Sequence, residues 1–171
     1  MPTPAYCKIV GENQGDITAG TFTEESVGNT YVEGHEDEFI VQAFNSEIVI
    51  PRDPQSGQPT GQRVHQPVVL TKVFDKCSPL LYQALTSGER LPTVDINWYR
   101  TSATGTQEHY FTISLVDAIL VNIHAFMFNC QDPANASFTH LEEVAFSYRK
   151  ILWTHEAAGT SAEDDWRTPM V

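Results

Sequence analysis

The sequence predicts a mainly β protein, built as a β-barrel or two packed antiparallel sheets with one flanking helix and one long loop. Most segments alternate apolar and polar residues with a period of two, and one short segment carries helix signals. Nothing suggests strands alternating regularly with helices, which argues against a parallel sheet. At 171 residues and 41% hydrophobic content, we expect one barrel domain over residues 1–171, held together without a metal or disulfide.

The strands are expected where the alternation is clearest. Residues 5–10 place Cys7 and Ile9 on one side, and residues 93–99 place Val94, Ile96 and Trp98 on one side. The same reading extends to four longer segments, residues 38–50, 109–116, 118–128 and 143–153. Several of these carry apolar residues on both faces, so the second face must meet another sheet, a helix or another subunit.

The helix is expected at about residues 78–87. Ser78 is a candidate N-cap, Pro79 suits the first turn, and Gly88 ends the helix. Its apolar side is formed by Leu80, Leu81 and Leu85.

The long loop is expected at residues 51–66, between two strands. It is dense in turn formers, namely Pro51, Pro54, Gly57, Pro59, Gly61 and the following Pro67. Loops of this length inside a domain are usually functional or disordered. Its polar side chains suit hydrogen bonding to a partner, and the alternative is a mobile, solvated hairpin tip.

Charge and cysteine content exclude several classes. The chain has 10 basic and 22 acidic side chains, a formal charge of −12, which disfavours nucleic acids and anionic membranes as partners. The relatively basic middle of the chain could pair with the acidic ends of a neighbouring copy. Three widely spaced cysteines, Cys7, Cys77 and Cys130, are expected to be reduced, partly buried core residues, which suits folding in the cytoplasm. The N-terminal residues lack the pattern of a Sec signal, and no apolar run is long enough for a membrane span.

No catalytic, cofactor or metal motif is evident. Gly57 and Gly61 lack the Lys-Ser/Thr pair and the following helix of a phosphate loop. The six histidines stand singly and are expected at the surface or in strands. Residues 34–38 cluster ionisable groups, which fits a solvated acidic turn better than an acid and base pair. Trp166, in an acidic tail, is expected either to dock on the barrel or to contact another molecule. We therefore expect no enzyme activity and no cofactor, and a structural or binding role.

Four runs resemble the haemolysin co-regulated protein (Hcp) family of the bacterial type VI secretion system. They are residues 51–65, 75–81, 108–113 and 148–153, and the ending Asp164-Asp165-Trp166-Arg167 is similar as well. The resemblance covers essentially the whole chain. It implies a tube subunit whose six-membered rings stack into the expelled inner tube, with small effectors held in the lumen. The partners it implies are further copies of the chain, the sheath and spike-tip proteins, and effector proteins.

The resemblance also gives the loop a role. A ring-stacking contact is implied for the polar residues Arg52, Asp53, Gln55, Ser56, Gly57, Gln58, Thr60, Gln62 and Arg63. As a hypothesis, Arg52 and Arg63 pair with Glu33, Glu36 or Asp37 of the next ring. The protein is expected in the cytoplasm before firing and outside the cell afterwards, by a Sec-independent route. The alternative is a secreted effector, or a barrel that binds a small ligand, without tube assembly.

Overall fold

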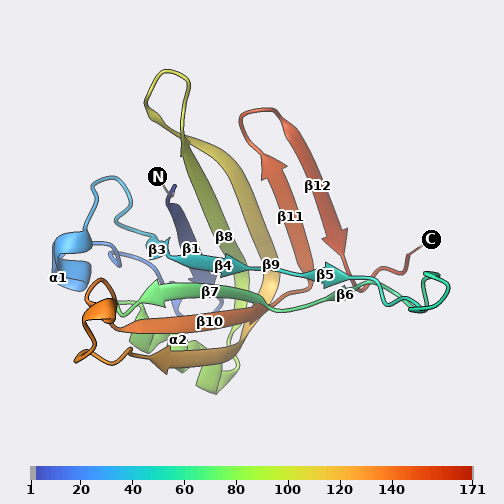
Figure 1. Ribbon diagram of the computed structural model, residues 1–171, viewed down its shortest axis with the longest axis horizontal. Coiled ribbons are helices and arrows are strands. Elements are labelled where there is room, and N and C mark those ends of the chain that lie inside the picture. The colour runs from blue at the N-terminus through green and yellow to red at the C-terminus, as the bar shows by residue number, and fades with distance from the viewer. Residues whose placement is uncertain (1–2, 171) are drawn as a thin grey trace.

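Antiparallel strands dominate the secondary structure of the protein, a computed structural model that describes residues 3–170 (Figure 1). Residues 1–2 and 171, the ends of the expected domain, lie outside the described residues. The strands are β1 (Ala5–Gly11), β2 (Gly15–Asp16), β3 (Phe39–Val41), β4 (Ala43–Asn45), β5 (Ile48–Val49), β6 (Val64–His65), β7 (Val68–Val73), β8 (Arg90–Thr101), β9 (Gln107–Phe126), β10 (Leu141–Ser147), β11 (Lys150–His155) and β12 (Thr160–Asp165). The helices are α1 (Glu24–Val27), α2 (Ser78–Ser87) and the 3-10 turns η1 (Gly28–Thr30) and η2 (Pro133–Asn135). The mainly β class predicted from the alternation is confirmed.

The main sheet closes on itself because the chain bends between β3 and β4. The order β1-β8-β9-β10-β7-β4 is hydrogen bonded throughout, and β3 pairs with β1 at the other edge. Gln42, between β3 and β4, donates its backbone N–H to the carbonyl of Thr71 at 2.8 Å. One bent segment thus joins the two edges, and a barrel results. Its interior is filled by side chains without exposed surface, among them Leu70, Ile96 and Leu115.

Strand β9 is longer than the two segments that the alternation predicts. It runs through 20 residues and bends at Asp117, whose φ of 52° lies in the left-handed region. Its first half pairs with β11 and its second half with β10, while β8 lies along the other side. Arg90 and Arg149 bind the Asp117 carboxylate at 2.8 and 3.1 Å and hold this bend. The expected strand 143–153 is instead divided into β10 and β11, and the expected strand 38–50 into β3, β4 and β5.

Helix α2 closes one end of the barrel, and its bounds match the prediction. Leu81 and Ala84 are buried against the barrel, and Gly88 ends the helix in the left-handed conformation at φ 68°. The cap differs from the prediction. Cys77 is the N-cap and makes no capping hydrogen bond with its side chain, while the hydroxyl of Ser78 donates to Glu142 at 2.6 Å. The Ser78 side chain therefore stabilises the contact between α2 and β10, not the helix end.

A buried ion cluster lies where α2 meets the barrel. The Lys72 ammonium of β7 contacts a carboxylate oxygen of Glu142 on β10 at 2.5 Å and one of Asp75 at 3.0 Å. All three side chains are at most 1% exposed. Although burial opposes it, the neighbouring carboxylates raise the pKa of Lys72 above its ordinary value. The ammonium is therefore charged, and it offsets two carboxylates that would otherwise be buried without a cation.

The cysteine expectation is correct for two of the three residues. Cys7 and Cys77 are buried and free, and burial raises the pKa of both thiols. Cys130 is exposed, contrary to the expectation of a core residue. Cys130 lies in the long connection between β9 and β10. The alternation of apolar and polar residues did not show that this connection projects from the barrel.

Removing the buried cation should destabilise the fold strongly. We expect Lys72→Met to lower the free energy of unfolding by about 3–5 kcal/mol, because Glu142 and Asp75 then stay buried without it. Urea denaturation followed by circular dichroism measures the loss. The control is Lys8→Met, since Lys8 forms a half-exposed pair with Asp16 at 3.4 Å that contributes about 0–1 kcal/mol. Equal stability of the two variants would contradict the role given to the cluster.

Candidate functional site

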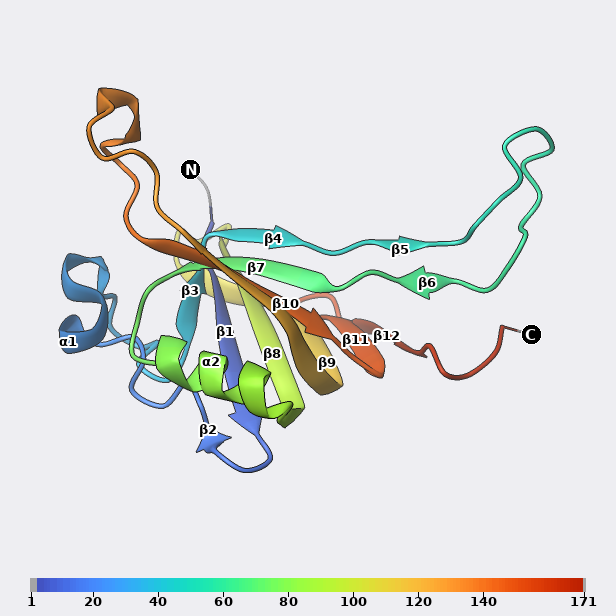
Figure 2. The same cartoon turned by 90° about the horizontal axis from the view of Figure 1, so that it is seen from below.

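The connection from β4 to β7 is a long arm that leaves the barrel (Figure 2). We call residues 46–66 the arm. Strands β5 and β6 pair within it, Ile48 with His65 and Val49 with Val64. The loop predicted at residues 51–66 is confirmed and forms the outer part and the returning strand of this arm. Most of the candidate residues that the sequence singled out are therefore gathered at one projecting tip.

The tip is an ordered turn. Arg52 pairs with Pro59 in an isolated bridge, and the backbone N–H of Asp53 donates to the carbonyl of Gln58 at 2.9 Å. The Asp53 carboxylate accepts hydrogen bonds from the Gln55 backbone at 2.8 Å and the Ser56 hydroxyl at 3.0 Å. These bonds, that from Gln55 first, lower the pKa of Asp53. The tip thus keeps a fixed shape while its candidate residues Arg52, Gln55, Ser56, Gly57, Gln58 and Thr60 stay exposed.

Arg63 anchors the base of the arm to the C-terminal segment of the same chain. Its guanidinium donates two hydrogen bonds to the Asp164 carboxylate, at 2.7 and 2.8 Å, and reaches the carbonyls of Asp165 and Thr168. The side-chain oxygen of Gln62 accepts a hydrogen bond from the backbone N–H of Met170 at 2.9 Å. The two candidate residues at the base therefore hold the arm in place. Pairing with another copy stays a prediction for Arg52, because the carboxylate partner of Arg63 lies in its own chain.

His65 extends this anchor into the protein. One of its ring nitrogens lies 2.7 Å from the hydroxyl of Tyr148 and the other 2.7 Å from Asp164. Burial, with a smaller contribution from Asp164, raises the pKa of Tyr148 to about 12, so the hydroxyl keeps its proton and can donate. Every group is satisfied when Nδ1 accepts from Tyr148 and Nε2–H donates to Asp164. His65 lies in a strand, β6, which is one of the two places expected for the histidines, and it is only 7% exposed.

Trp166 docks beside this histidine. Of the two alternatives that the sequence left for Trp166, docking on its own chain is therefore the one observed. Its indole N–H donates to the carbonyl of Tyr148, and its ring centroid lies 5.6 Å from that of His65. We call Arg63, His65, Tyr148, Asp164 and Trp166 the anchor. Its histidine and carboxylate are arranged like a general base and its orienting group. The hydroxyl that faces the histidine belongs to buried Tyr148, 4% exposed, which leaves a substrate no access to it.

The acidic run at residues 34–38 is more ordered than the expected solvated turn. His35 stacks on Tyr6 with ring centroids 3.7 Å apart and pairs with Glu38 at 2.9 Å. Glu36 accepts hydrogen bonds from the Gly34 backbone and from the Tyr31 hydroxyl. These contacts lower the pKa of Glu36, the Gly34 backbone first. The run is therefore a fixed acidic surface of the protein.

The described residues also bear on metal binding and on membrane insertion. Residues 3–170 hold no group of three or more histidine, cysteine or acidic side chains placed to bind a metal ion. The described helices also include none that is both long and apolar enough to cross a membrane.

Comparisons with known proteins point to one family. The family described as "Type VI secretion system effector, Hcp" matches residues 6–155. The "Major exported protein" of Pseudomonas aeruginosa is 71% identical over 170 residues, 99% of each chain. Among solved structures, one titled "Crystal structure of Hcp protein" has a TM-score of 0.91 at 51% identity, covering 96% of this chain and all of that one. The "Secreted protein Hcp3 from Pseudomonas aeruginosa" has a TM-score of 0.83 at 60% identity, covering 98% and 100%.

If the anchor holds the arm in place, breaking it by mutation should loosen the arm. Asp164→Asn removes the carboxylate that Arg63 and His65 share, so we expect backbone hydrogen exchange in residues 46–66 to accelerate by roughly tenfold. The control is Glu163→Gln, which changes an exposed neighbour that pairs with Lys150 at 2.8 Å. Unchanged exchange in the Asp164 variant would contradict the anchor.

The pH dependence follows from the same carboxylate. The hydrogen bonds from Arg63, and then those from His65, lower the pKa of Asp164 despite its partial burial. The stabilisation is therefore complete above the unfolded pKa of about 4 and is lost as pH falls through the lower folded pKa. Arm protection, corrected for intrinsic exchange, should be flat from about pH 7 to 5 and decrease only below about 4.

Proposed function

The chain belongs to the Hcp family of the type VI secretion system, and on that premise we propose that it is the structural subunit of the secreted tube. Six copies form a ring, and rings stack along one axis. The observation that supports assembly most directly is the arm, an ordered and anchored projection. Among the described residues, those of its tip, 51–60, form hydrogen bonds only with one another. The proposal takes residues 1–171 as one barrel domain.

The outer surface of the barrel also supports assembly. Ile119 and Val121 on β9 are 43% and 44% exposed, although the other face of the strand packs in the core. These are side chains of the two-faced segment for which the sequence predicted a second covering surface. Contacts between unlike surfaces of one polypeptide close into a ring when the rotation between copies fits, and they extend along an axis when the stacking surfaces differ.

The remaining parts of the proposal follow from family membership. The subunit accumulates in the cytoplasm and leaves the cell through the secretion apparatus, by a Sec-independent route. It meets sheath and spike-tip proteins on the way and carries small effectors in the lumen of the ring. Catalysis is not part of the proposal, since the His65 pair is sealed by Tyr148. The ligand-binding alternative requires space inside one barrel, whereas side chains such as Leu70 and Leu115 fill the interior.

Sedimentation across a salt series tests the assembly. We expect particles of six copies, seen as hollow rings in negative stain, at every salt concentration. Each chain carries a formal charge of −12, so a ring carries six times that load and rings repel one another. Stacking should increase with salt, because the Debye length is about 8 Å at physiological ionic strength and falls as salt rises. A monomer at all concentrations would contradict the ring, and stronger stacking at low salt would contradict the role of charge.

The arm tip is tested by charge reversal. Arg52→Glu should leave rings intact and abolish tubes and secretion, because the proposed contact with Glu33, Glu36 or Asp37 of the next ring becomes repulsive. Arg52 is the better site than Arg63, whose substitution would also break the anchor. The control is Lys8→Glu, which makes the same change in net charge on β1. Tubes that form normally with Arg52→Glu would show that the tip is passive.

A further inference from the structure

The connection between β9 and β10 carries an exposed apolar surface. We call residues 127–140 the excursion. Met127, Phe128 and Phe138 in it are 60%, 40% and 52% exposed. Asp132 is the one Asp, Glu, Lys or Arg of this segment. Three large apolar side chains in water within so short a segment of an acidic protein indicate a contact surface.

The excursion is preformed. The ring of Phe128 lies between Phe126 and Phe138, with centroid distances of 5.6 and 4.6 Å. The backbone is held by the turn η2, where the Asp132 carboxylate caps the N–H of Ala134 at 2.9 Å. Asn135 donates from its side chain to the carbonyl of Asn129 at 3.1 Å. A partner therefore meets an ordered surface, at a small cost in conformational entropy.

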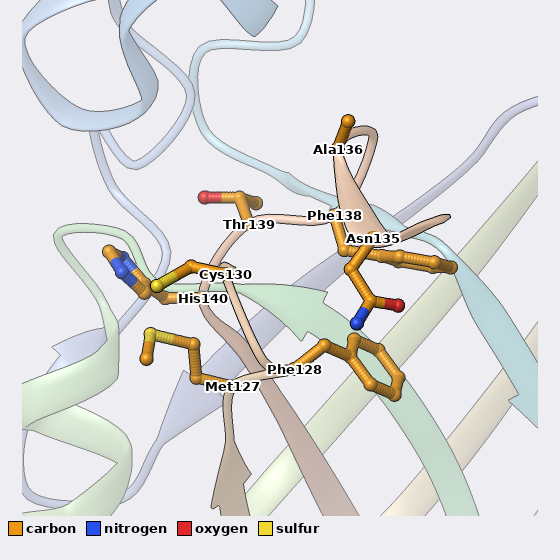
Figure 3. A pocket seen from close by; sticks show the side chains of 8 residues that line it. All are labelled: Met127, Phe128, Cys130, Asn135, Ala136, Phe138, Thr139 and His140. Atoms are coloured by element: carbon orange, nitrogen blue, oxygen red, sulfur yellow. The ribbon is translucent and has the colours of Figure 1, made fainter. Parts of the chain in front are cut away.

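A pocket opens in this surface (Figure 3). It has a volume of about 180 Å³ and is lined by Met127, Phe128, Cys130, Asn135, Ala136, Phe138, Thr139 and His140. A protein cavity of about 150 Å³ holds a group the size of benzene. The pocket thus has room for one aliphatic side chain of a partner.

The surface beside the pocket is acidic. A second hollow of about 170 Å³ joins Phe74 and His140 to residues 26–30 of α1 and η1, so the excursion and this segment form one continuous surface. Glu24, Glu25 and Glu33 form no ion pair with any described residue. Between Lys8 and Arg52 the sequence has no lysine or arginine, and Lys76 is the cation that lines a hollow together with Glu24 and Glu25. A partner that fits here combines an exposed aliphatic side chain with a nearby cation.

The arm has both features. Ile48, Ile50 and Val64 are 39%, 45% and 37% exposed. Arg52 follows Ile50 by two residues and forms no ion pair within the described chain. The arm and the excursion project from opposite ends of the barrel (Figure 2), so they cannot meet within one molecule.

We propose that the arm of one copy docks on the excursion of a copy in the next ring, with an aliphatic side chain of β5 or Ile50 in the pocket and Arg52 beside Glu24, Glu25 and Glu33. The inference rests on the assembly proposed above and names the two surfaces that meet. Because these surfaces are unlike, each copy offers one arm and one excursion, and the contact repeats from copy to copy. The occupant is a second copy because the same chain supplies both the aliphatic group and the complementary charge.

Cross-linking tests the pairing with a thiol that the chain already has. Cys130 is exposed and lines the pocket, whereas Cys7 and Cys77 are buried. In assembled Ile50→Cys protein, a short bismaleimide should join position 50 of one copy to Cys130 of the next. Denaturing gels should then show a ladder of dimers and larger species. The ladder should disappear when Cys130→Ser is added. A matched variant, Thr104→Cys on the exposed turn between β8 and β9, should give no ladder.

A second variant separates this inference from the function on which it rests. Phe138→Asp places a charge at the pocket and should reduce the Ile50→Cys ladder severalfold, while the melting temperature stays near that of the parent, since Phe138 is half exposed. Stacked rings that give no Cys130-dependent ladder would overturn the pairing and leave the tube proposal standing. Protein that remains monomeric would overturn both.

Discussion

A two-stranded ribbon is only marginally stable in water, and the arm is such a ribbon. It keeps its extended form because Asp164, near the end of β12, binds both Arg63 and His65 of the arm. The C-terminal segment is thereby fixed as well, since Trp166 docks on Tyr148 beside the same histidine. The shape of the outward surface therefore depends on one carboxylate, which lies about 100 residues from its partners in sequence.

Closure of the barrel decides where function can be located. Gln42 joins the two edges of the sheet, α2 covers one end, and apolar side chains fill the interior. The ion cluster of Lys72, Glu142 and Asp75 fills the contact between α2 and β7 with charged side chains that are at most 1% exposed. The surfaces that remain for contact with other molecules therefore include two projections, the arm on one end of the barrel and the excursion on the other.

Local signals in the sequence predicted the parts of the fold that local physics determines. Period-two alternation placed most strands, and Pro79 with Gly88 placed α2, because these residues act through their own backbone geometry. Tertiary contacts determine the rest. A lone lysine in a strand looks solvent-facing, so the burial of Lys72 could not be read before Glu142 was placed opposite it. The continuity of β9 through Asp117 likewise depends on two distant arginines, Arg90 of β8 and Arg149 of the turn between β10 and β11. The proline and glycine residues of the loop predicted its position, but they carry no signal for the anchor that holds it.

Net charge then limits which surfaces can approach one another. With 22 acidic and 10 basic side chains, most approaches between two copies bring carboxylates together. The excursion has one charge in 14 residues, and Asp53 at the arm tip is already satisfied by its own turn. Removing water from the excursion or from Asp53 therefore costs little free energy. The surrounding acidic surfaces of two copies repel each other. In the proposed assembly, repulsion over most of the molecule combined with attraction between the arm and the excursion favours one register between copies over the alternatives.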